Sequence, residues 1–382
     1  MHPTVAPFIL LLQKVFKHLH ECADMKLKKI FSYAPDVDAI VLANSREPHV
    51  DMSFFYVTGL SSGLFEGCVA IVYPDHLELI SSALEEESAR KGGFDISIFE
   101  NKKEAEQLLK DKLENLNKIG VNADELTYAS FLRLKKASEA EFIDVSSAIN
   151  TARLTKDAEE LSRTKKACKI ISEVAEEIPS LVKEGMTEME LAAELNYSMQ
   201  KKGASQPAFS TLVCFGKNAS EPHHSSGETT LKKGDFVLCD MGAQYKRYVS
   251  DITRTFIFGE ADAEQVKMYE TVLESQKIAF NMMKAGVQAR DVHKKVKEFL
   301  DNVYENRFIH GLGHTIGLSV HDGERMNIDS ELVLGENMVF TVEPGVYIPG
   351  VGGVRIEDDV VVTKERIDIL TSASRELQII EG

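Results

Sequence analysis

The sequence predicts a mixed α/β protein of two domains. Its 382 residues are more than one ordinary hydrophobic core organises, so the length favours two domains over one. Short apolar runs of strand length alternate with stretches of helical spacing, which is typical of α/β folds. Hydrophobic residues make up 43% of the chain and charged residues 27%, the balance of a folded protein rather than a disordered one. We expect an α/β N-terminal domain over residues 25–150 and a second domain over residues 151–382, with residues 1–24 as a candidate N-terminal extension.

Charge and cysteine content exclude several classes of protein. The formal net charge is −16 and no basic stretch is interleaved with aromatic residues, so no nucleic-acid partner is expected. The five cysteines are odd in number, widely spaced and free of CxxC pairs, which predicts reduced thiols and a cytoplasmic location. The first apolar run, residues 8–12, is too short to span a membrane and no basic residue precedes it, so neither membrane insertion nor export is expected.

The first domain combines short apolar strands with two helical stretches. It carries no cluster of metal-ligating residue types, so we expect the chemistry to lie in the second domain. The predicted strands cover residues 39–42, 54–57, 68–73 and 77–80, and the predicted helices cover residues 85–91 and 104–116.

A charged helical tract over residues 156–183 leads into the second domain. Gly, Ser and Pro are sparse in it, so it is not a flexible linker. Beyond it, a weak internal repeat relates residues 183–191 to residues 284–292. In each copy a glycine, Gly185 or Gly286, ends one helix shortly before the next begins. Two such units suggest duplicated halves that face one another, with a site between them.

Four predicted strands of the second domain carry carboxylates. Residues 235–241 and 248–258 predict a hairpin that sets Asp240 and Asp251 opposite one another. Residues 338–343 and 354–362 predict two further strands, with Glu343 at a strand end and Glu357 in mid-strand. A sheet holds ligands rigidly, which the geometry of a metal site favours.

These four carboxylates, together with the imidazole of His314, form a donor set for metals. Hard oxygen and borderline nitrogen donors suit divalent Mn, Co, Fe or Zn rather than thiolate-bound structural zinc. Four negative charges against two divalent cations leave the cluster near neutral once a hydroxide is counted. Two neighbouring ions can share that hydroxide, polarise a carbonyl and hold the oxyanion that forms on attack. The set therefore predicts a two-metal hydrolase.

The ligand-type residues stand in five motifs: Asp240-Met241-Gly242, Asp251-Ile252-Thr253-Arg254-Thr255, His310-Gly311-Leu312-Gly313-His314, Thr341-Val342-Glu343-Pro344-Gly345-Val346-Tyr347 and Gly353-Val354-Arg355-Ile356-Glu357-Asp358. Their order resembles that of the pita-bread metallopeptidases, in particular proline dipeptidases (prolidases) and Xaa-Pro aminopeptidases. The resemblance covers roughly residues 153–380 and, more loosely, the first domain, where residues 55–59 look like the family's N-terminal signature. It implies a C-terminal pita-bread catalytic domain with pseudo-twofold halves, preceded by a smaller α/β creatinase-like domain.

The resemblance also implies a role for each ligand. Asp240 would chelate one metal, and His314 with Glu343 would chelate the other. Asp251 and Glu357 would bridge both ions. Glu343 would also carry protons between the nucleophilic water and the leaving nitrogen.

Further residues would contact the substrate on the same resemblance. His223 matches a histidine that contacts substrate, and the adjacent His224 leaves open which of the two faces the site. His321 matches a second histidine that stabilises the tetrahedral intermediate. Arg325 matches an arginine that binds the free carboxylate of a dipeptide, a task that suits a guanidinium fork. Positions that line the substrate pocket, or lie just behind it, are His310, Tyr347 and Arg355.

The resulting prediction is an Xaa-Pro dipeptidase that uses a metal-bridging hydroxide. Each subunit of an expected homodimer would hold two divalent ions, Mn or Co, with Zn and Fe as alternatives. The nearest alternative is an Xaa-Pro aminopeptidase acting on longer peptides, which differs in how the pocket beyond the proline is closed. A third reading is a non-catalytic pita-bread binding protein, which would be expected to lack several of the five ligands.

Two residues close to these motifs or helices are expected to play no chemical part. Strand alternation turns Cys239 away from the face of Asp240, so we expect a buried, inert thiol. His293 lies on an amphipathic helical stretch and is expected at the surface.

Overall fold

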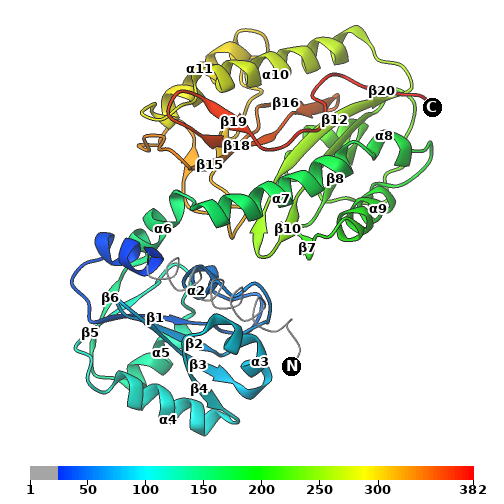
Figure 1. Ribbon diagram of the computed structural model, residues 1–382. Helices are drawn as coiled ribbons and strands as arrows, with labels where there is room; N and C mark the ends of the chain where they lie inside the picture. Colours follow the sequence, from blue (N-terminus) through cyan, green and yellow to red (C-terminus); the bar gives the residue numbers. More distant parts are fainter. Residues whose placement is uncertain (1–24) are drawn as a thin grey trace, which may run out of the picture. The chain divides into compact units, whose positions relative to one another are not determined.

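The computed structural model describes residues 25–382, which form two compact units that meet in sequence between Arg153 and Leu154 (Figure 1). The mixed α/β class predicted from the sequence is confirmed in both units. The candidate extension over residues 1–24, with its apolar run, lies outside the described residues. No helix among residues 25–382 is long and apolar enough to cross a bilayer.

Unit 1 is built on one six-stranded sheet with the strand order β4-β3-β2-β1-β5-β6. The β1–β2 and β2–β3 pairs are antiparallel, and the remaining pairs are parallel. Helices α4 and α5 cover the sheet through buried leucines. The strands are β1 (Ala39–Ala43), β2 (Val69–Val72), β3 (Leu77–Ser82), β4 (Asp95–Phe99), β5 (Lys118–Val121) and β6 (Glu141–Asp144), and the helices are α2 (Met52–Thr58), α3 (Glu86–Ala89), α4 (Lys102–Leu113), α5 (Tyr128–Ala137) and α6 (Ser146–Leu154).

One predicted strand of unit 1 is wrong. Residues 54–57 belong to helix α2 although their aromatic and β-branched composition favours a strand. Asp51 caps the start of the helix by accepting a hydrogen bond from the Ser53 N–H at 2.7 Å. Gly59 ends it in the left-handed region at φ 66°. The two caps and nearly all-round burial outweigh the strand propensity of the segment.

Unit 2 has two helical layers with strands between them (Figure 1). One apolar cluster joins α10 and α11 to one face of the strands, and a second joins α7 and α9 to the other face. Strand β9 shows the alternation directly, because Leu238 packs in the first cluster and Cys239 in the second. The helices are α7 (Ala158–Ala175), α8 (Ile178–Leu181), α9 (Glu188–Lys201), α10 (Ala263–Met282) and α11 (Ala289–Asp301).

The strands of unit 2 form several small sheets rather than one large one. The four-stranded sheet β20-β12-β9-β8 comprises β8 (Leu212–Phe215), β9 (Phe236–Met241), β12 (Ile252–Phe258) and β20 (Ile379–Ile380). The sheet β11-β10-β7 comprises β7 (Gln206–Pro207), β10 (Ala243–Tyr245) and β11 (Tyr248–Val249). Two of the remaining sheets are the pairs β13 (Gly313–His314) with β14 (Arg325–Met326) and β16 (Gly345–Ile348) with β17 (Gly352–Arg355). The third has the order β15-β18-β19 and comprises β15 (Val339–Val342), β18 (Asp358–Val362) and β19 (Ile367–Ile369).

The internal repeat of the sequence corresponds to a repeated turn in unit 2. Gly185 has φ 80° and Gly286 has φ 89°, so both glycines adopt the left-handed region in the turn between two helices. Neither glycine ends a helix as predicted, because α8 ends at Leu181 and α10 ends at Met282. The Gly185 N–H donates to Leu231 O at 2.9 Å, and the Gly286 N–H donates to Leu334 O at 2.8 Å. In each copy, therefore, the glycine of the turn is hydrogen-bonded to a segment that follows later in the chain, at Leu231 or at Leu334.

Two predictions about burial have opposite outcomes. Cys239 is buried on the face away from Asp240, as expected, and burial raises the pKa of its thiol well above the ordinary value. His293 is only 4% exposed, so its expected surface position is wrong. It follows the buried Val292 on the inner face of α11, and its ring packs against Phe308 with centroids 5.5 Å apart.

Candidate metal centre

Asp240 and Asp251 come from neighbouring strands, but the predicted direct pairing between them is wrong. In the antiparallel β9–β12 register, Asp240 is opposite Thr253. Asp251 precedes β12 and is the diagonal neighbour of Asp240, because the chain leaves β11 and enters a different sheet at this point. The backbone N–H of Asp251 donates to a carboxylate oxygen of Asp359 at 2.9 Å. This hydrogen bond holds the backbone of Asp251 at the point where the chain passes from one sheet to the other.

His314 and Glu343 are brought together by a close approach of two strands. A Cβ atom at Gly313 would lie 2.0 Å from Thr341 O, so only glycine lets β13 pack against β15. The His314 N–H donates to Thr341 Oγ1 at 3.0 Å. His314 Nε2 then lies 3.6 Å from Glu343 Oε1 and 3.8 Å from Asp251 Oδ2.

Glu357 lies between β17 and β18, not in mid-strand as predicted. The two strands belong to different sheets, so the chain changes partners at this residue. Its backbone N–H donates to Thr253 O at 3.1 Å, and its Oε2 accepts from Thr253 Oγ1 at 2.6 Å. Thr253 thus anchors Glu357 from the facing strand β12.

The carboxylates of this cluster repel one another in a buried setting. Burial raises the pKa of Asp251 well above its ordinary value, and the charges of Glu357 and Asp240 raise it further. Burial and repulsion from Asp240 raise the pKa of Glu343 to about 7, although Arg355 opposes the shift. Burial lowers the pKa of His314 to about 4, so its ring is neutral at neutral pH. Such a set gains stability from added positive charge.

The geometry fits divalent cations. Asp251, His314 and Glu357 each offer one ligand atom, and these atoms lie within 4.8 Å of one another. The Oδ1 atoms of Asp240 and Asp251 are buried and have no hydrogen-bond partner among residues 25–382. Buried carboxylate oxygens without donors are costly unless a cation satisfies them. Oxygen and imidazole donors without thiolates suit Mn, Co, Fe or Zn.

A second group of side chains lies beside the carboxylates. Arg355 Nη2 donates to Asp240 Oδ2 at 2.6 Å, and Arg355 Nη1 donates to Tyr347 Oη at 2.9 Å. The Tyr347 hydroxyl is also 2.8 Å from His310 Nε2. His310 Nδ1 is 4.0 Å from Glu343 Oε2. This chain places His310 behind the ligands rather than among them.

The histidines and the arginine expected to contact substrate lie close to the cluster. The rings of His314 and His321 meet with centroids 4.3 Å apart. Burial lowers the pKa of His321, and the nearby charges of Arg325 and His223 lower it further. Burial also lowers the pKa of His310 to about 3, with smaller contributions that include His223. His223 and Arg325 are exposed, so both are accessible to a ligand.

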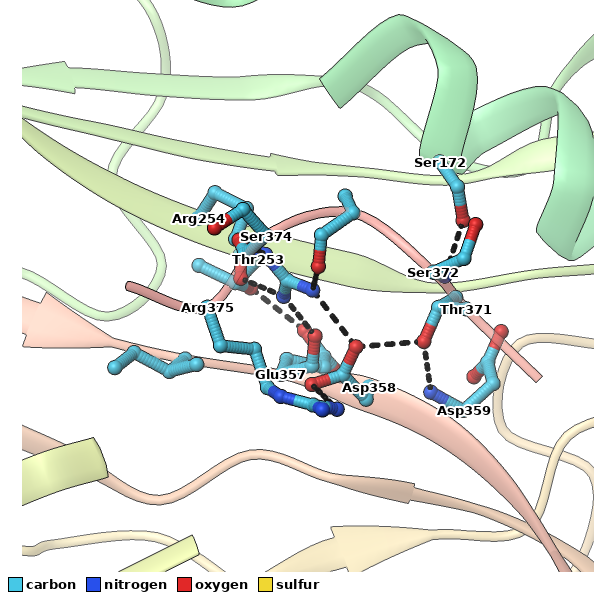
Figure 2. Close-up of polar contacts among 12 residues, drawn as sticks. Ser172, Thr253, Arg254, Glu357, Asp358, Asp359, Thr371, Ser372, Ser374 and Arg375 are labelled. Atoms are coloured by element: carbon cyan, nitrogen blue, oxygen red, sulfur yellow. Dashed lines mark hydrogen bonds and ion pairs between the residues drawn. The ribbon is translucent and has the colours of Figure 1, made fainter. Parts of the chain in front are cut away.

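A buried ion pair, which was not predicted from the sequence, lies directly behind Glu357. Figure 2 shows Arg254 donating to the carbonyl oxygen of Glu357 at 2.6 Å and to Asp358 Oδ1 at 2.7 Å. It also donates to Ala373 O and Ser374 O, each at 2.8 Å. Arg254 therefore ties β12 to the segment that carries Glu357 and to the chain near the C-terminus. The signal in the sequence was a single charged residue inside the otherwise uncharged run of residues 252–258, which has the composition of a buried strand.

Comparison with known proteins agrees with this arrangement. The family model for metallopeptidase family M24 matches residues 162–364. The family model for the creatinase/prolidase N-terminal domain matches residues 30–155. The chain is 35% identical over 356 residues to an Xaa-Pro dipeptidase of Pyrococcus horikoshii, covering 92% of this chain and 98% of that one.

Solved structures give the same result. An Xaa-Pro dipeptidase from Bacillus anthracis matches with a TM-score of 0.87 and 33% identity, over 94% of this chain and 99% of that chain. An X-Pro aminopeptidase from Thermotoga maritima matches with a TM-score of 0.84 and 31% identity, over 90% of this chain and 98% of that chain. The predicted fold, a pita-bread domain preceded by a creatinase-like domain, is confirmed.

Proposed function

Because this chain belongs to metallopeptidase family M24, we propose that it hydrolyses the peptide bond before proline in Xaa-Pro dipeptides. The observation that carries the proposal is the convergence of Asp251, His314 and Glu357 within 4.8 Å, beside two buried oxygens that lack donors. The relatives named as Xaa-Pro dipeptidases match nearly the whole chain, which supports the same substrate class.

The metal centre of the proposal uses the five residues Asp240, Asp251, His314, Glu343 and Glu357 to hold two divalent ions, Mn or Co. When bound, such ions supply a hydroxide at neutral pH and polarise the scissile carbonyl. Four carboxylates against two divalent cations leave little net charge, which relieves the repulsion that raises the pKa values of Asp251 and Glu343.

Side chains of this protein would transfer the proton, stabilise the oxyanion and bind the substrate. Glu343 takes a proton from the attacking water and passes it to the leaving proline nitrogen, because its carboxylate can accept a proton and then release it. His321 donates to the oxyanion, and His223 contacts the substrate backbone. Arg325 binds the free carboxylate of the dipeptide as a bidentate fork. Tyr347 and Arg355 hold His310 and Asp240 in place.

Proline explains why a dedicated enzyme is needed. The Xaa-Pro bond is a tertiary amide without an N–H donor, and the proline ring restricts the residue before it. Peptidases that recognise that N–H therefore lose a contact, whereas a site that acts on the carbonyl does not.

An Xaa-Pro aminopeptidase remains the second candidate. The observation that favours it is the similarity to the Thermotoga maritima X-Pro aminopeptidase, which nearly equals the similarity to the dipeptidase structure. The two activities differ in whether Arg325 closes the pocket beyond the proline.

The deciding experiment compares three substrates with the Mn- or Co-loaded protein: Met-Pro, Met-Pro-Ala and C-terminally amidated Met-Pro. A dipeptidase cleaves the free dipeptide alone, and Arg325→Ala lowers kcat/KM for it by roughly a hundredfold because a charge-assisted fork is lost. Comparable cleavage of all three substrates would establish an aminopeptidase and remove the role of Arg325. Cleavage of none, with several metals supplied, would contradict both and favour a binding protein.

A homodimer and a cytoplasmic location complete the proposal. The thiols of Cys68, Cys168, Cys214 and Cys239 are free and buried, which suits a reducing compartment. Light scattering of the purified protein tests the dimer directly.

A further inference from the structure

The carboxylate of Glu188 is buried outside the candidate metal centre and has no role in the proposed reaction. It is the first residue of α9 and its side chain is 0% exposed. Burying a carboxylate is unfavourable unless hydrogen bonds replace its water. The donors that replace it all belong to one stretch of chain, residues 215–227.

Glu188 holds this stretch, which we call the 215–227 segment, at both ends and in the middle. Its Oε1 accepts from the Phe215 N–H at 2.8 Å and from Asn218 Nδ2 at 2.8 Å. Its Oε2 accepts from the Gly227 N–H at 2.9 Å and lies 3.0 Å from His224 Nε2. One carboxylate therefore closes the segment into a loop.

The loop matters because His223 lies on it. The charge of His223 contributes to the lowered pKa values of His310 and His321, behind larger effects of burial and arginine, so His223 lies near these two histidines beside the candidate metal centre. His224 is turned to Glu188 instead. The two adjacent histidines therefore have different surroundings: His223 lies beside the candidate metal centre, and His224 is hydrogen-bonded to Glu188.

The second copy of the internal repeat shows that the turn itself does not need this carboxylate. Residue 289, the counterpart of Glu188, is a fully buried alanine. The Ala289 N–H donates to Leu332 O at 2.9 Å, as the Glu188 N–H donates to Thr229 O at 3.2 Å. The backbone contacts are the same with and without a carboxylate. The glutamate is therefore specific to the half that carries the 215–227 segment.

His224 supplies the one titratable donor to Glu188. Its side chain is 16% exposed, and its Nδ1 lies 3.2 Å from Glu221 Oε2. Burial lowers the pKa of His224, but its contacts with Glu188 and Glu221 outweigh burial and raise the pKa overall. These two glutamates are the charged groups that face the ring among the described residues. A protonated ring donates to both of them.

We propose that Glu188, through His224 and the backbone of the 215–227 segment, is a positioning residue that keeps His223 in the substrate site. This inference rests on the proposed function, because it takes His223 as a substrate contact. Neither Glu188 nor His224 touches the metal ligands, so both act on substrate binding rather than on metal binding.

The test uses the full chain with Glu188→Gln and His224→Asn, and Glu194→Gln as the control. Glu194 is an exposed glutamate on the same helix. Glu188→Gln should raise KM for Met-Pro roughly tenfold with little change in kcat, because a positioned contact is loosened. It should also raise deuterium uptake in residues 215–227, while Mn²⁺ affinity by calorimetry stays within about twofold. His224→Asn keeps an N–H donor and should lie between Glu188→Gln and wild type, and Glu194→Gln should match wild type.

A double variant separates positioning from general damage. If Glu188 acts through His223, adding Glu188→Gln to His223→Ala lowers kcat/KM no further than His223→Ala alone. Additive losses, or an equal loss of Mn²⁺ affinity, would overturn the proposal. If Glu188→Gln does not fold, the same cycle is run with His224→Asn.

Hydrogen-exchange measurements at several pH values test the proposal independently of any measurement of enzyme activity. Because its pKa is raised in the folded protein, protonated His224 stabilises the segment below the ordinary histidine pKa of about 6.5, and this support is lost as the pH rises through the raised pKa. Protection factors of residues 215–227 should fall as the pH rises above about 6.5 in the wild type and stay level in His224→Asn. Equal pH profiles in the two proteins would refute the proposal that His224 and Glu188 hold the 215–227 segment. Failure to cleave Met-Pro with the pH effect present would instead refute only the proposed function.

Discussion

Three of the five candidate metal ligands are held by a residue that is not itself a candidate ligand. Thr253 holds Glu357, Asp359 holds the backbone of Asp251, and Thr341 holds His314. Such supports fix the direction in which a carboxylate or imidazole points, and this decides how well a metal is bound. Substitutions behind the site should therefore be felt in metal affinity as well as in stability.

Mn²⁺ binding should weaken as the pH falls. In the metal-free protein, burial and repulsion raise the pKa of Glu343 to about 7, so this carboxyl group holds a proton below neutrality. The metal must displace that proton, whereas His314, whose pKa is lowered to about 4, has none to lose. We expect affinity to drop roughly tenfold for each proton and pH unit below about 7. Calorimetric titrations at pH 6 and pH 8, in buffers of different ionisation enthalpy, measure both affinity and proton release; equal values at the two pH values would contradict the expectation.

Arg254→Met should destabilise unit 2 by about 3 kcal/mol, because it leaves the buried Asp358 and several carbonyl oxygens without their donor. Arg375→Met is the matched control, since Arg375 contacts the same carboxylate at 3.6 Å from a partly exposed position and should cost less than about 1 kcal/mol. Urea unfolding of the Mn-loaded proteins gives both values. Similar losses for the two variants would show that the buried contacts of Arg254 are not special.

For single residues, the sequence predicted the candidate metal ligands better than the buried residues that hold the site in place. The five ligand positions and the residues expected beside them are brought together in one place, because spacing along motifs carries that information. Glu188 and Arg254 received no role, since a buried charge is recognised only when its donors, 27 to 39 residues away for Glu188, are known. His293 was misplaced because helical periodicity alone does not separate residues at the edge of the buried face.

Among the secondary structure elements, two strands that were predicted to carry a candidate ligand are interrupted at that residue. Asp251 lies between β11 and β12, and Glu357 lies between β17 and β18. Continuous strands were predicted at both places, because apolar alternation runs through the interruption. The change of sheet depends on distant pairing partners, which local pattern does not report. Helix α2 was missed for a related reason, since its caps outweigh its strand-like composition.

Glycines at element boundaries should respond very differently to substitution. Gly313→Ala places a Cβ against Thr341 O, so we expect a loss of about 3 kcal/mol and weaker Mn²⁺ binding at the adjacent His314. Gly286→Ala meets no atom within 4 Å and is strained only by its φ of 89°, which should cost about 1 kcal/mol without affecting the metal. Chemical denaturation and Mn²⁺ calorimetry on the pair test this ranking. It fails if Gly286→Ala is the more damaging change.

For the whole molecule, composition and alternation were enough to predict two α/β domains, and the motifs were enough to predict the family fold. The sheet orders were not predicted, because pairs such as β12 with β20 join strands about 120 residues apart in sequence. The repeated turns at Gly185 and Gly286 are the exception, since each is a local motif with its own signal.

Metal removal should act on one unit. The mutually repelling carboxylates all belong to unit 2, so chelation should speed hydrogen exchange in its strands and lower its unfolding temperature. Exchange in the six-stranded sheet of unit 1 should stay unchanged. Peptide-resolved exchange with and without EDTA, with Mn²⁺ added back as the control, distinguishes the two units. Equal acceleration in both would mean that the metal stabilises the chain as a whole.

The donorless oxygens of Asp240 and Asp251 have a consequence for the life of the protein in a cell. Chains made when divalent ions are scarce would spend more time locally open, and open chains are degraded first. The amount of this protein should then follow the metal supply even if its gene is read at a constant rate. Pulse-chase turnover in metal-replete and metal-depleted cultures, with Asp251→Asn as a variant in which the charge repulsion is reduced, would reveal that dependence.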